Sequence, residues 1–424
     1  MELFDNAWHL LGSLSGWSFF AMFGMVLLTD APRYFLGIQA TAAAFILLEH
    51  RPYGPLLPLP PVSILLAGHN EEDAIEKCVR SLREQTFSDF EIVCVDDGSS
   101  DRTFSIMRRL QSERLVQSIG RLQLRGGKAA ALNLAARMAH GEIFIVTDCD
   151  CSFEPDAIEE LLRPLTGNAS VGAVSGNILV RNWHRSMTTA IQGIEYLISI
   201  SLGKTFAGVL DQVCCISGAF GAFRRSAWDL IGGMDAGGGE DLDFTIRLRL
   251  AGYKTVFAQR AICYTDVPES AYVLLRQRSR WERDSYWIRF RKYRRLFNPF
   301  APGFLWREAA HQWDFLLFTA LPTLFFPFYL GWLFATFGVT GFVLLAAVAL
   351  PLFMLDLACF AAAALITNRP VYWRLLPFLP MYGVFSTYVM KLHRLYAYSS
   401  EAIVSLSLKD NYVPKKVHNL NDWR

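Results

Sequence analysis

Short apolar runs alternate with amphipathic stretches along the middle of the chain. The short runs have the length of buried strands, and the stretches between them repeat apolar positions at the spacing of a helix face. We expect strands at 62–67, 90–95 and 143–147, and helices at 72–85, 102–112 and 128–139. Strands that alternate with helices predict right-handed crossovers and a mostly parallel α/β sheet flanked by helices. Ligands of such sheets bind outside the carboxyl ends of the strands.

Long uncharged runs flank this section on both sides. Residues 7–29 contain no Asp, Glu, Lys or Arg and are long enough to cross a hydrocarbon layer of roughly 30 Å as a helix. A second run at 34–48 fits either a short span or an interfacial helix, and we favour the span. Residues 315–355 predict two spans with a tight turn near Gly338, and residues 375–390 form a third, shorter run that either crosses the membrane or lies along its interface.

Charge and composition set the orientation of these segments. The chain is 52% hydrophobic with a net charge of only +2, but its basic residues are concentrated locally. Arg369 and Arg374 lie between two predicted spans, and such positive loops are typically cytoplasmic. The chain therefore divides into an N-terminal transmembrane region (1–50), a Pro-rich linker (51–61), a cytoplasmic α/β domain (62–265), amphipathic interface helices (266–312), C-terminal transmembrane helices (313–400) and a polar tail (401–424).

Two acidic pairs follow predicted strands. Asp96-Asp97 comes directly after 90–95, where an Asx-type turn that caps the next helix is the structural alternative. Capping does not explain two consecutive acids, and a carboxylate there can accept from the imide N–H of a uracil. Asp148 and Asp150 follow 143–147 and lie on one face of an extended segment. Carboxylates at this position suit Mg²⁺ or Mn²⁺, with a diphosphate and water completing the ligand set. A solvated turn is the alternative.

The cysteines do not predict disulfides or a metal site. Seven of the eight lie in the polar middle of the chain, several inside apolar runs, which predicts buried free thiols in a reducing compartment. Cys149 and Cys151 interleave with Asp148 and Asp150, so a thiolate site for zinc is an alternative. No second Cys or His pair has zinc-like spacing, which disfavours it.

Two further motifs carry charges suited to a phosphate and a hydroxyl group. Lys128 follows Gly126-Gly127 at a predicted helix start, where free N–H groups and an ammonium suit a phosphate or a base carbonyl. Glu240-Asp241 follows three glycines at a second helix start. One carboxylate there suffices as the base that deprotonates an attacking hydroxyl group. Ordinary N-terminal capping acids are the alternative for this pair.

A strongly basic stretch begins near Gln277. Nine Lys or Arg residues stand between Arg276 and Arg295 against two acids. An interfacial helix attracted to anionic lipid explains this composition, and the adjacent spans argue against nucleic acid as the partner. Within the stretch, Trp281 is suited to stack on a sugar face and Arg280 to neutralise a leaving diphosphate.

The whole set resembles the family 2 inverting glycosyltransferases, in particular the membrane-embedded synthases of β-linked polysaccharides such as chitin-oligosaccharide, poly-N-acetylglucosamine, hyaluronan and cellulose. The similarity covers about residues 61–298 and implies a GT-A-like fold. Its motifs imply a catalytic base at Asp241 beside Glu240. They imply Asp148 and Asp150 at the metal. Donor contacts are implied for His69, Asn70, Glu71, Asp96, Asp97, Lys128, Asp148, Gln277, Arg280 and Trp281, and acceptor contacts for Ser217, Gly218, Ala219, Phe220 and Trp281.

Two local features refine the resemblance. Gln192-x-x-Glu195-Tyr196 resembles the amphipathic interface helix of these synthases. The family often has Thr before the Glu-Asp pair, whereas this chain has Gly239, which leaves the base in place but removes the usual helix cap.

The resemblance implies a multi-pass enzyme of the bacterial inner membrane that needs Mg²⁺ or Mn²⁺. It would transfer a sugar from a UDP-sugar to a glycan or glycolipid acceptor, with N-acetylglucosamine favoured and glucose second, and pass a growing β-linked chain into the membrane. A homo-oligomer or an accessory export subunit would fit the same activity. The alternatives are a single glycosylation of a membrane lipid and, from another class, a non-catalytic membrane transporter or scaffold.

Overall fold

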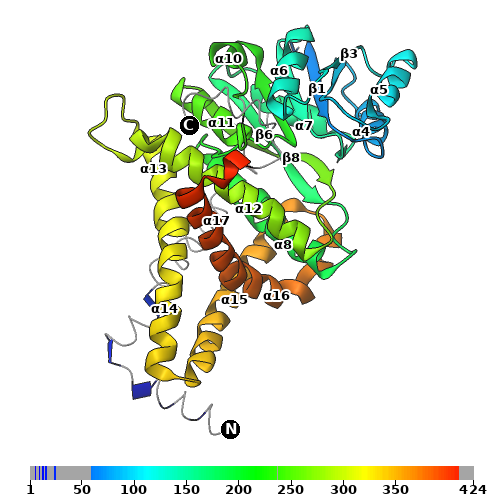
Figure 1. Cartoon of the computed structure of the whole chain (residues 1–424). Helices are drawn as coiled ribbons and strands as arrows, with labels where there is room; N and C mark the ends of the chain where they lie inside the picture. Colours follow the sequence, from blue (N-terminus) through cyan, green and yellow to red (C-terminus); the bar gives the residue numbers. More distant parts are fainter. Residues whose placement is uncertain are drawn as a thin grey trace.

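The computed structural model describes residues 59–235 and 237–409, together with a few single positions between residues 5 and 24. The predicted N-terminal spans, most of the Pro-rich linker and the polar tail beyond residue 409 therefore lie outside the described residues, apart from those single positions. An α/β domain occupies one end of the molecule, and a long helical hairpin formed by α14 (Leu321–Phe337) and α15 (Thr340–Thr367) projects away from it (Figure 1).

The sheet of this domain has eight strands in the order β3-β2-β1-β4-β7-β6-β8-β5. The strands are β1 (Val62–Gly68), β2 (Phe90–Asp96), β3 (Ser118–Arg121), β4 (Ile143–Thr147), β5 (Ser152–Phe153), β6 (Val171–Val180), β7 (Phe220–Arg224) and β8 (Lys254–Thr265). β1, β2, β3 and β4 are parallel, as are β6 and β8. β7 runs antiparallel to both β4 and β6, and β5 runs antiparallel to β8.

The sheet is therefore mixed: it is parallel throughout in the section before residue 150, whereas beyond it β6 and β8 are parallel but β7 and β5 run antiparallel to their neighbours. In the section before residue 150, each strand is joined to the next by a helix, which brings the chain back in the same direction. The helices that follow the first, second and third strands are α4 (Ile75–Arg83), α5 (Thr103–Ser112) and α6 (Lys128–Met138). A helical segment and an irregular loop lead from β6 to β7. β7 lies between β4 and β6 and runs in the opposite direction to both.

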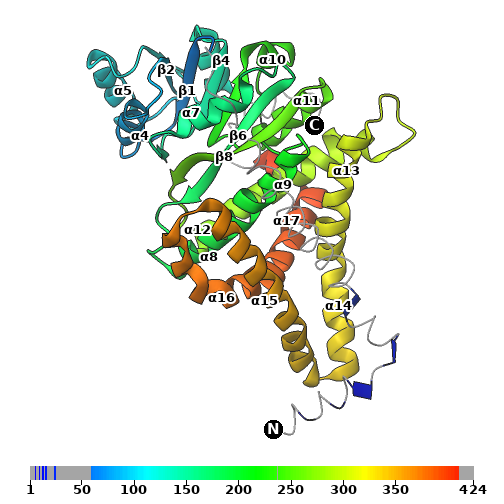
Figure 2. The ribbon, with the colours of Figure 1, turned by 180° about the vertical axis from the view of Figure 1, so that it is seen from behind.

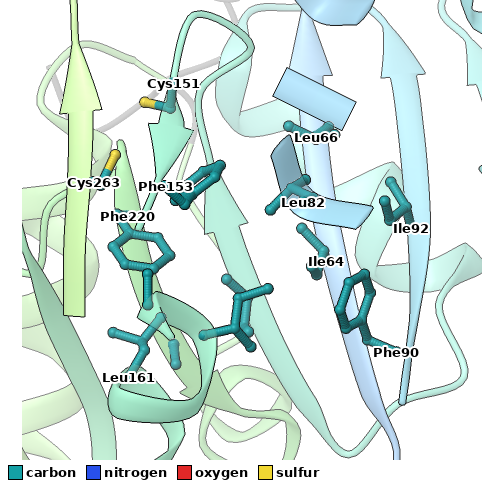
Figure 3. Close-up of a cluster of buried hydrophobic side chains, with 14 of the residues drawn as sticks. Ile64, Leu66, Leu82, Phe90, Ile92, Cys151, Phe153, Leu161, Phe220 and Cys263 are labelled. Atoms are coloured by element: carbon teal, nitrogen blue, oxygen red, sulfur yellow. The ribbon is translucent and has the colours of Figure 1, made fainter. Parts of the chain in front are cut away.

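The core lies on both faces of the sheet. Successive side chains of β1 point to opposite faces, so Ile64 and Leu66 join one buried cluster and Leu65 joins the other. The first cluster contains Ile64, Leu66 and Leu82 of the α4 side and extends to Phe153 and Phe220 (Figure 3). Burial on both faces explains why these strands appear in the sequence as continuous apolar runs.

A layer of helices separates the sheet from the hairpin (Figure 2). It contains α8 (Met187–Tyr196), α12 (Ala271–Trp287), α16 (Leu379–Val384) and α17 (Met390–Val404). α12 packs against α17, and α8 packs against α16. Of these helices, α12 lies within the segment 266–312 predicted to hold interface helices, and α8 contains the Gln192-x-x-Glu195-Tyr196 motif, whereas α16 and α17 lie within the segment predicted as C-terminal spans.

Two helices among the described residues are long and apolar enough to cross a membrane, Trp306–Phe337 and Thr340–Thr367. The first continues α13 (Trp306–Phe315) into α14, and the chain turns at Gly338 with φ +54°, where the tight turn is predicted. The second helix extends beyond residue 355 and carries Asp356 within it. The apolar run at 375–390 is not among these helices, because residues 370–378 form 3₁₀ turns and the helix that follows carries Lys391 and Arg394.

Candidate active site

The loops after β1 and β2 are locked together at the carboxyl edge of the sheet. The His69 ring Nδ1 lies 2.9 Å from the Asp97 carbonyl oxygen. Asn70 adopts a left-handed backbone with φ +59°, and its N–H donates to the Ser99 hydroxyl oxygen at 2.9 Å. Ser100 returns a bond from its N–H to the Asn70 side-chain oxygen at 3.0 Å. These bonds hold Glu71, the next residue, at the rim of the site.

Asp96 and Asp97 are buried, and both carboxylates are used within the protein. Asp97 accepts from the N–H groups of Gly126 and Gly127, at 2.6 and 2.9 Å, and so fixes the start of α6. Burial raises the pKa of Asp97 against the effect of these two donors. Asp96 has no exposed surface and pairs with Arg121 at 2.9 Å. Asp96 is thus enclosed and bonded to Arg121. Asp97 is also buried, with 3% of its surface exposed.

Lys128 contacts both the segment after β4 and the loop before β7. Its ammonium Nζ lies 2.5 Å from an Asp148 carboxylate oxygen and donates to the Gly218 carbonyl oxygen at 3.2 Å. α6 positions Lys128, β4 ends just before Asp148, and Gly218 precedes β7. Three segments far apart in the sequence therefore converge on one cation.

The α11 helix (Glu240–Leu250) brings its first acids to the same place. A Cβ atom built on Gly218 would lie 3.0 Å from Lys128 Nζ and 3.8 Å from the Asp241 Cβ. The Thr245 hydroxyl ties α11 to the loop before β7, because it accepts from the Ile216 N–H at 2.9 Å. Burial raises the pKa of Glu240, although the nearby Lys128 charge opposes the shift. Asp148, Lys128 and the start of α11 at Asp241 therefore lie close together around Gly218.

Asp148 and Asp150 face the site while Cys149, between them, faces the core. Cys149 is 2% exposed and lies among the buried side chains under the sheet. It stands in a turn, in which the Cys151 N–H donates to the Asp148 carbonyl oxygen at 3.4 Å, and not in the extended segment that the sequence predicts. All eight cysteines are free thiols, and burial raises the pKa of Cys149 well above its ordinary value. A buried thiol that resists ionisation is a poor ligand, so the zinc alternative finds no support here.

The carboxylates around Asp148 repel one another, which suits a cation. Burial raises the pKa of Glu71 to about 7, and the charges of Asp150 and Asp148 add to the shift. Burial also raises the pKa of Asp150, with Asp148 as the second cause. In residues 59–235 and 237–409, no group of three or more His, Cys, Asp or Glu side chains is arranged to hold a metal ion. Two carboxylates such as those of Asp148 and Asp150 suit a Mg²⁺ or Mn²⁺ ion only where a diphosphate and water supply its remaining ligands.

The Gln277, Arg280 and Trp281 motif lies on α12, where its neighbour Arg278 connects the helix to α8. Arg278 pairs with Glu195 at 2.6 Å, and its guanidinium stacks over the Trp281 ring at 4.2 Å. Trp281 remains 42% exposed, and the Gln277 side-chain oxygen is buried without a hydrogen-bond partner. The motif is held together on one helix, and its contact with a sugar donor stays a prediction.

The loop 217–220 contacts the site through its backbone and the core through the Phe220 side chain. Gly218 contacts Lys128 through its carbonyl oxygen, and the Ala219 carbonyl oxygen accepts from the Thr147 hydroxyl at 2.8 Å. Phe220 has no exposed surface and packs on Phe153 with ring centroids 5.0 Å apart. The side chain of Phe220 is thus part of the core and not of an acceptor surface, which the sequence resemblance does not distinguish.

Arg181 lies beside Asp150, and the sequence does not predict it as a site residue. Arg181 follows β6, and its guanidinium donates to the Asp150 carbonyl oxygen at 3.1 Å and to the Ser152 hydroxyl oxygen at 2.8 Å. A single arginine after a strand carries no local motif. Only the sheet order, which sets β6, β8 and β5 side by side, could have indicated it.

The site and sheet together define a class of protein. A mixed α/β sheet that places paired acids after a central strand, opposite an acid-bearing helix start, is a GT-A-like arrangement. Residues 63–231 match the model of the glycosyl transferase family 2.

Two sets of relatives are similar to the chain beyond this domain. The poly-beta-1,6-N-acetyl-D-glucosamine synthases of Staphylococcus epidermidis and Staphylococcus aureus (strain MSSA476) are each 30% identical over 233 residues, which is 55% of this chain and 56% of theirs. The chain thus spans about half the length of the curated relatives it matches. A mannosyltransferase from Pyrobaculum calidifontis, solved with GDP-Man and Mn²⁺, has a TM-score of 0.56 at 21% identity, covering 90% of this chain and 99% of its own. This likeness concerns the fold.

Proposed function

We propose that this protein is a membrane-bound inverting glycosyltransferase that extends a β-linked glycan from a UDP-sugar. The observation that carries the proposal is the convergence of Asp148, Lys128, Gly218 and Asp241 around one point. The similarity to poly-beta-1,6-N-acetyl-D-glucosamine synthases supports N-acetylglucosamine as the donor sugar, with glucose second. Two helices in the described part of the chain are long and apolar enough to cross a membrane, and the proposal places the site on the cytoplasmic side of a bacterial inner membrane.

The chemistry follows from the charges at the site. A Mg²⁺ or Mn²⁺ ion held by Asp148 and Asp150 would neutralise the leaving diphosphate of the donor. Lys128, paired with Asp148, would add a second positive charge at the same group. Asp241, close to Gly218, would take the proton from an acceptor hydroxyl as that oxygen attacks the anomeric carbon. Attack from the side opposite the diphosphate inverts the anomeric centre.

The half-exposed Trp281, with Arg278 stacked against its ring, supports the acceptor contact predicted for Trp281. An indole ring supported in this way presents a flat face to a sugar ring. A growing chain that rests there would stay bound between additions. A single transfer to a membrane lipid is the alternative function.

Product size distinguishes the two functions. Full-length protein in lipid nanodiscs is incubated with radiolabelled UDP-N-acetylglucosamine or UDP-glucose and Mn²⁺, and the products are separated by size. A ladder or a polymer supports the synthase, and a single glycolipid supports one transfer. Incorporation of neither sugar would contradict both functions and leave a non-catalytic role.

A further inference from the structure

Arg181 holds the backbone of the Asp148-Cys149-Asp150 segment from the side. Its guanidinium donates to the Asp150 carbonyl oxygen at 3.1 Å and to the Ser152 hydroxyl oxygen at 2.8 Å. It also forms a two-pronged ion pair with Asp266, at 3.0 and 2.8 Å. One side chain thus contacts the segment after β4, the first residue of β5 and the residue that follows β8.

The sheet register brings these residues together. β6 and β8 are parallel and pair Val180 with Thr265, so Arg181 and Asp266 leave the sheet side by side. β5 runs antiparallel to β8 and pairs Ser152 with Tyr264, which places Asp150 beside the same edge. The position of Arg181 is therefore a consequence of the topology and does not depend on a flexible loop.

Thr265 fixes the side chain of Asp150 while Arg181 fixes its backbone. The Thr265 hydroxyl donates to an Asp150 carboxylate oxygen at 3.2 Å. An acid that must meet a cation needs its carboxylate in one orientation, and groups that orient a ligand are often as important as the ligand itself. We infer that Arg181 and Thr265 position Asp150 for a divalent cation. The inference rests on the proposed function, because it takes Asp150 as a metal ligand.

A purely structural role is the competing explanation. Arg181 and Asp266 keep 41% and 51% of their side chains exposed, and an exposed ion pair contributes little to stability. The neighbouring pair of Arg185 and Glu269, 62% and 51% exposed with a distance of 3.0 Å, is of the same kind but is not among the groups that hold Asp150. Arg185 is therefore the matched control: it removes a similar ion pair from the same segment and leaves the contacts of Asp150 intact.

The test measures cation binding directly. Full-length protein is titrated with Mn²⁺ in the presence of UDP, and free Mn²⁺ is followed by electron paramagnetic resonance. Arg181→Ala and Thr265→Val should each raise the Kd for Mn²⁺ by about 10–100-fold, the usual effect of removing a group that orients a metal ligand. Arg181→Lys should fall between these variants and the wild type, because an ammonium cannot bridge acceptors as the guanidinium fork does. UDP binding without metal and the unfolding temperature in chelator should not change.

The outcomes separate the explanations. Wild-type Mn²⁺ affinity in Arg181→Ala, or an equal loss in Arg185→Ala, would overturn the positioning role. If Arg181→Ala fails to fold, Thr265→Val decides, since it removes one hydroxyl group and keeps the shape of the side chain. Failure of the wild-type protein to bind Mn²⁺ with UDP would contradict the proposed function itself, which distinguishes the two failures.

Discussion

Gly239 provides a sharp test of how the catalytic helix is positioned. It precedes Glu240 with φ +70°, a left-handed conformation that costs a residue with a side chain roughly 1–2 kcal/mol. A Cβ atom there would lie 2.6 Å from Ile288 Cδ1 and 3.2 Å from the Asp284 Cβ. Ordinary carbon contacts are about 3.5–4.0 Å, so the start of α11 must shift by about 1 Å. Overpacking of this kind adds about 1–3 kcal/mol.

Gly239→Ala should therefore lower the free energy of unfolding by about 2–5 kcal/mol. A shift of about 1 Å at Asp241 should also slow sugar transfer by on the order of 100-fold. Initial transfer rates and thermal unfolding of the full-length protein measure both effects. The left-handed backbone and the close Ile288 side chain also leave no room at position 239 for the Thr that often precedes the Glu-Asp pair in the family that the sequence resembles.

Two further variants separate strain from collision. Gly252→Ala, at the other end of α11, has φ +90° but no neighbour within 4 Å, so it should lose stability without losing activity. Ile288→Val removes the colliding Cδ1 atom at a cost of about 0.5–1.5 kcal/mol by itself, and should restore part of the rate in the Gly239→Ala background. Equal transfer rates in Gly239→Ala and the wild type would refute the reasoning.

Three other predictions concern the charges of the site. Chelation by EDTA should stop sugar transfer and added Mn²⁺ or Mg²⁺ should restore it; a rate indifferent to the chelator would remove the metal role of Asp148 and Asp150. Lys128→Met should raise the KM for the donor about 10–100-fold, since a hydrogen bond to a charged group contributes about 1.5–3 kcal/mol, and donor titrations measure it. Glu71 has a pKa raised to about 7, so its folded form holds a proton that the unfolded chain releases above pH 4.5. Stability of the metal-free protein should fall as pH rises through 7, and Glu71→Gln should flatten that fall in unfolding measured from pH 5 to 8; an unchanged slope would exclude Glu71 as its cause.

The sequence predicts the first part of the sheet well because each strand there is a compact apolar run bounded by turns. β4 matches its predicted bounds at 143–147, and β1 and β2 each extend one residue further. The extended segment predicted through Asp148 and Asp150 is instead a turn at residues 149–150, in which Cys149 is buried.

The direction of β7 and the burial of individual side chains such as Phe220 depend on contacts between distant segments, which no local sequence pattern shows. β7 runs antiparallel because a long helical detour separates it from β6, and the detour leaves no mark on the strand itself. Phe220 begins that strand and turns into the core, and Asp96 is enclosed by Arg121 from the next strand. Arg181 joins the site only because β6 and β8 pair in register.

Asp241→Asn tests the central claim most directly. The variant keeps the size of the side chain and removes its capacity to accept a proton at the acceptor side of Gly218. We predict that sugar transfer falls by about 10²–10⁴-fold, the usual contribution of a general base, while UDP binding in the presence of Mn²⁺ is retained. Transfer at the wild-type rate would contradict the convergence of donor and acceptor groups on which the account depends.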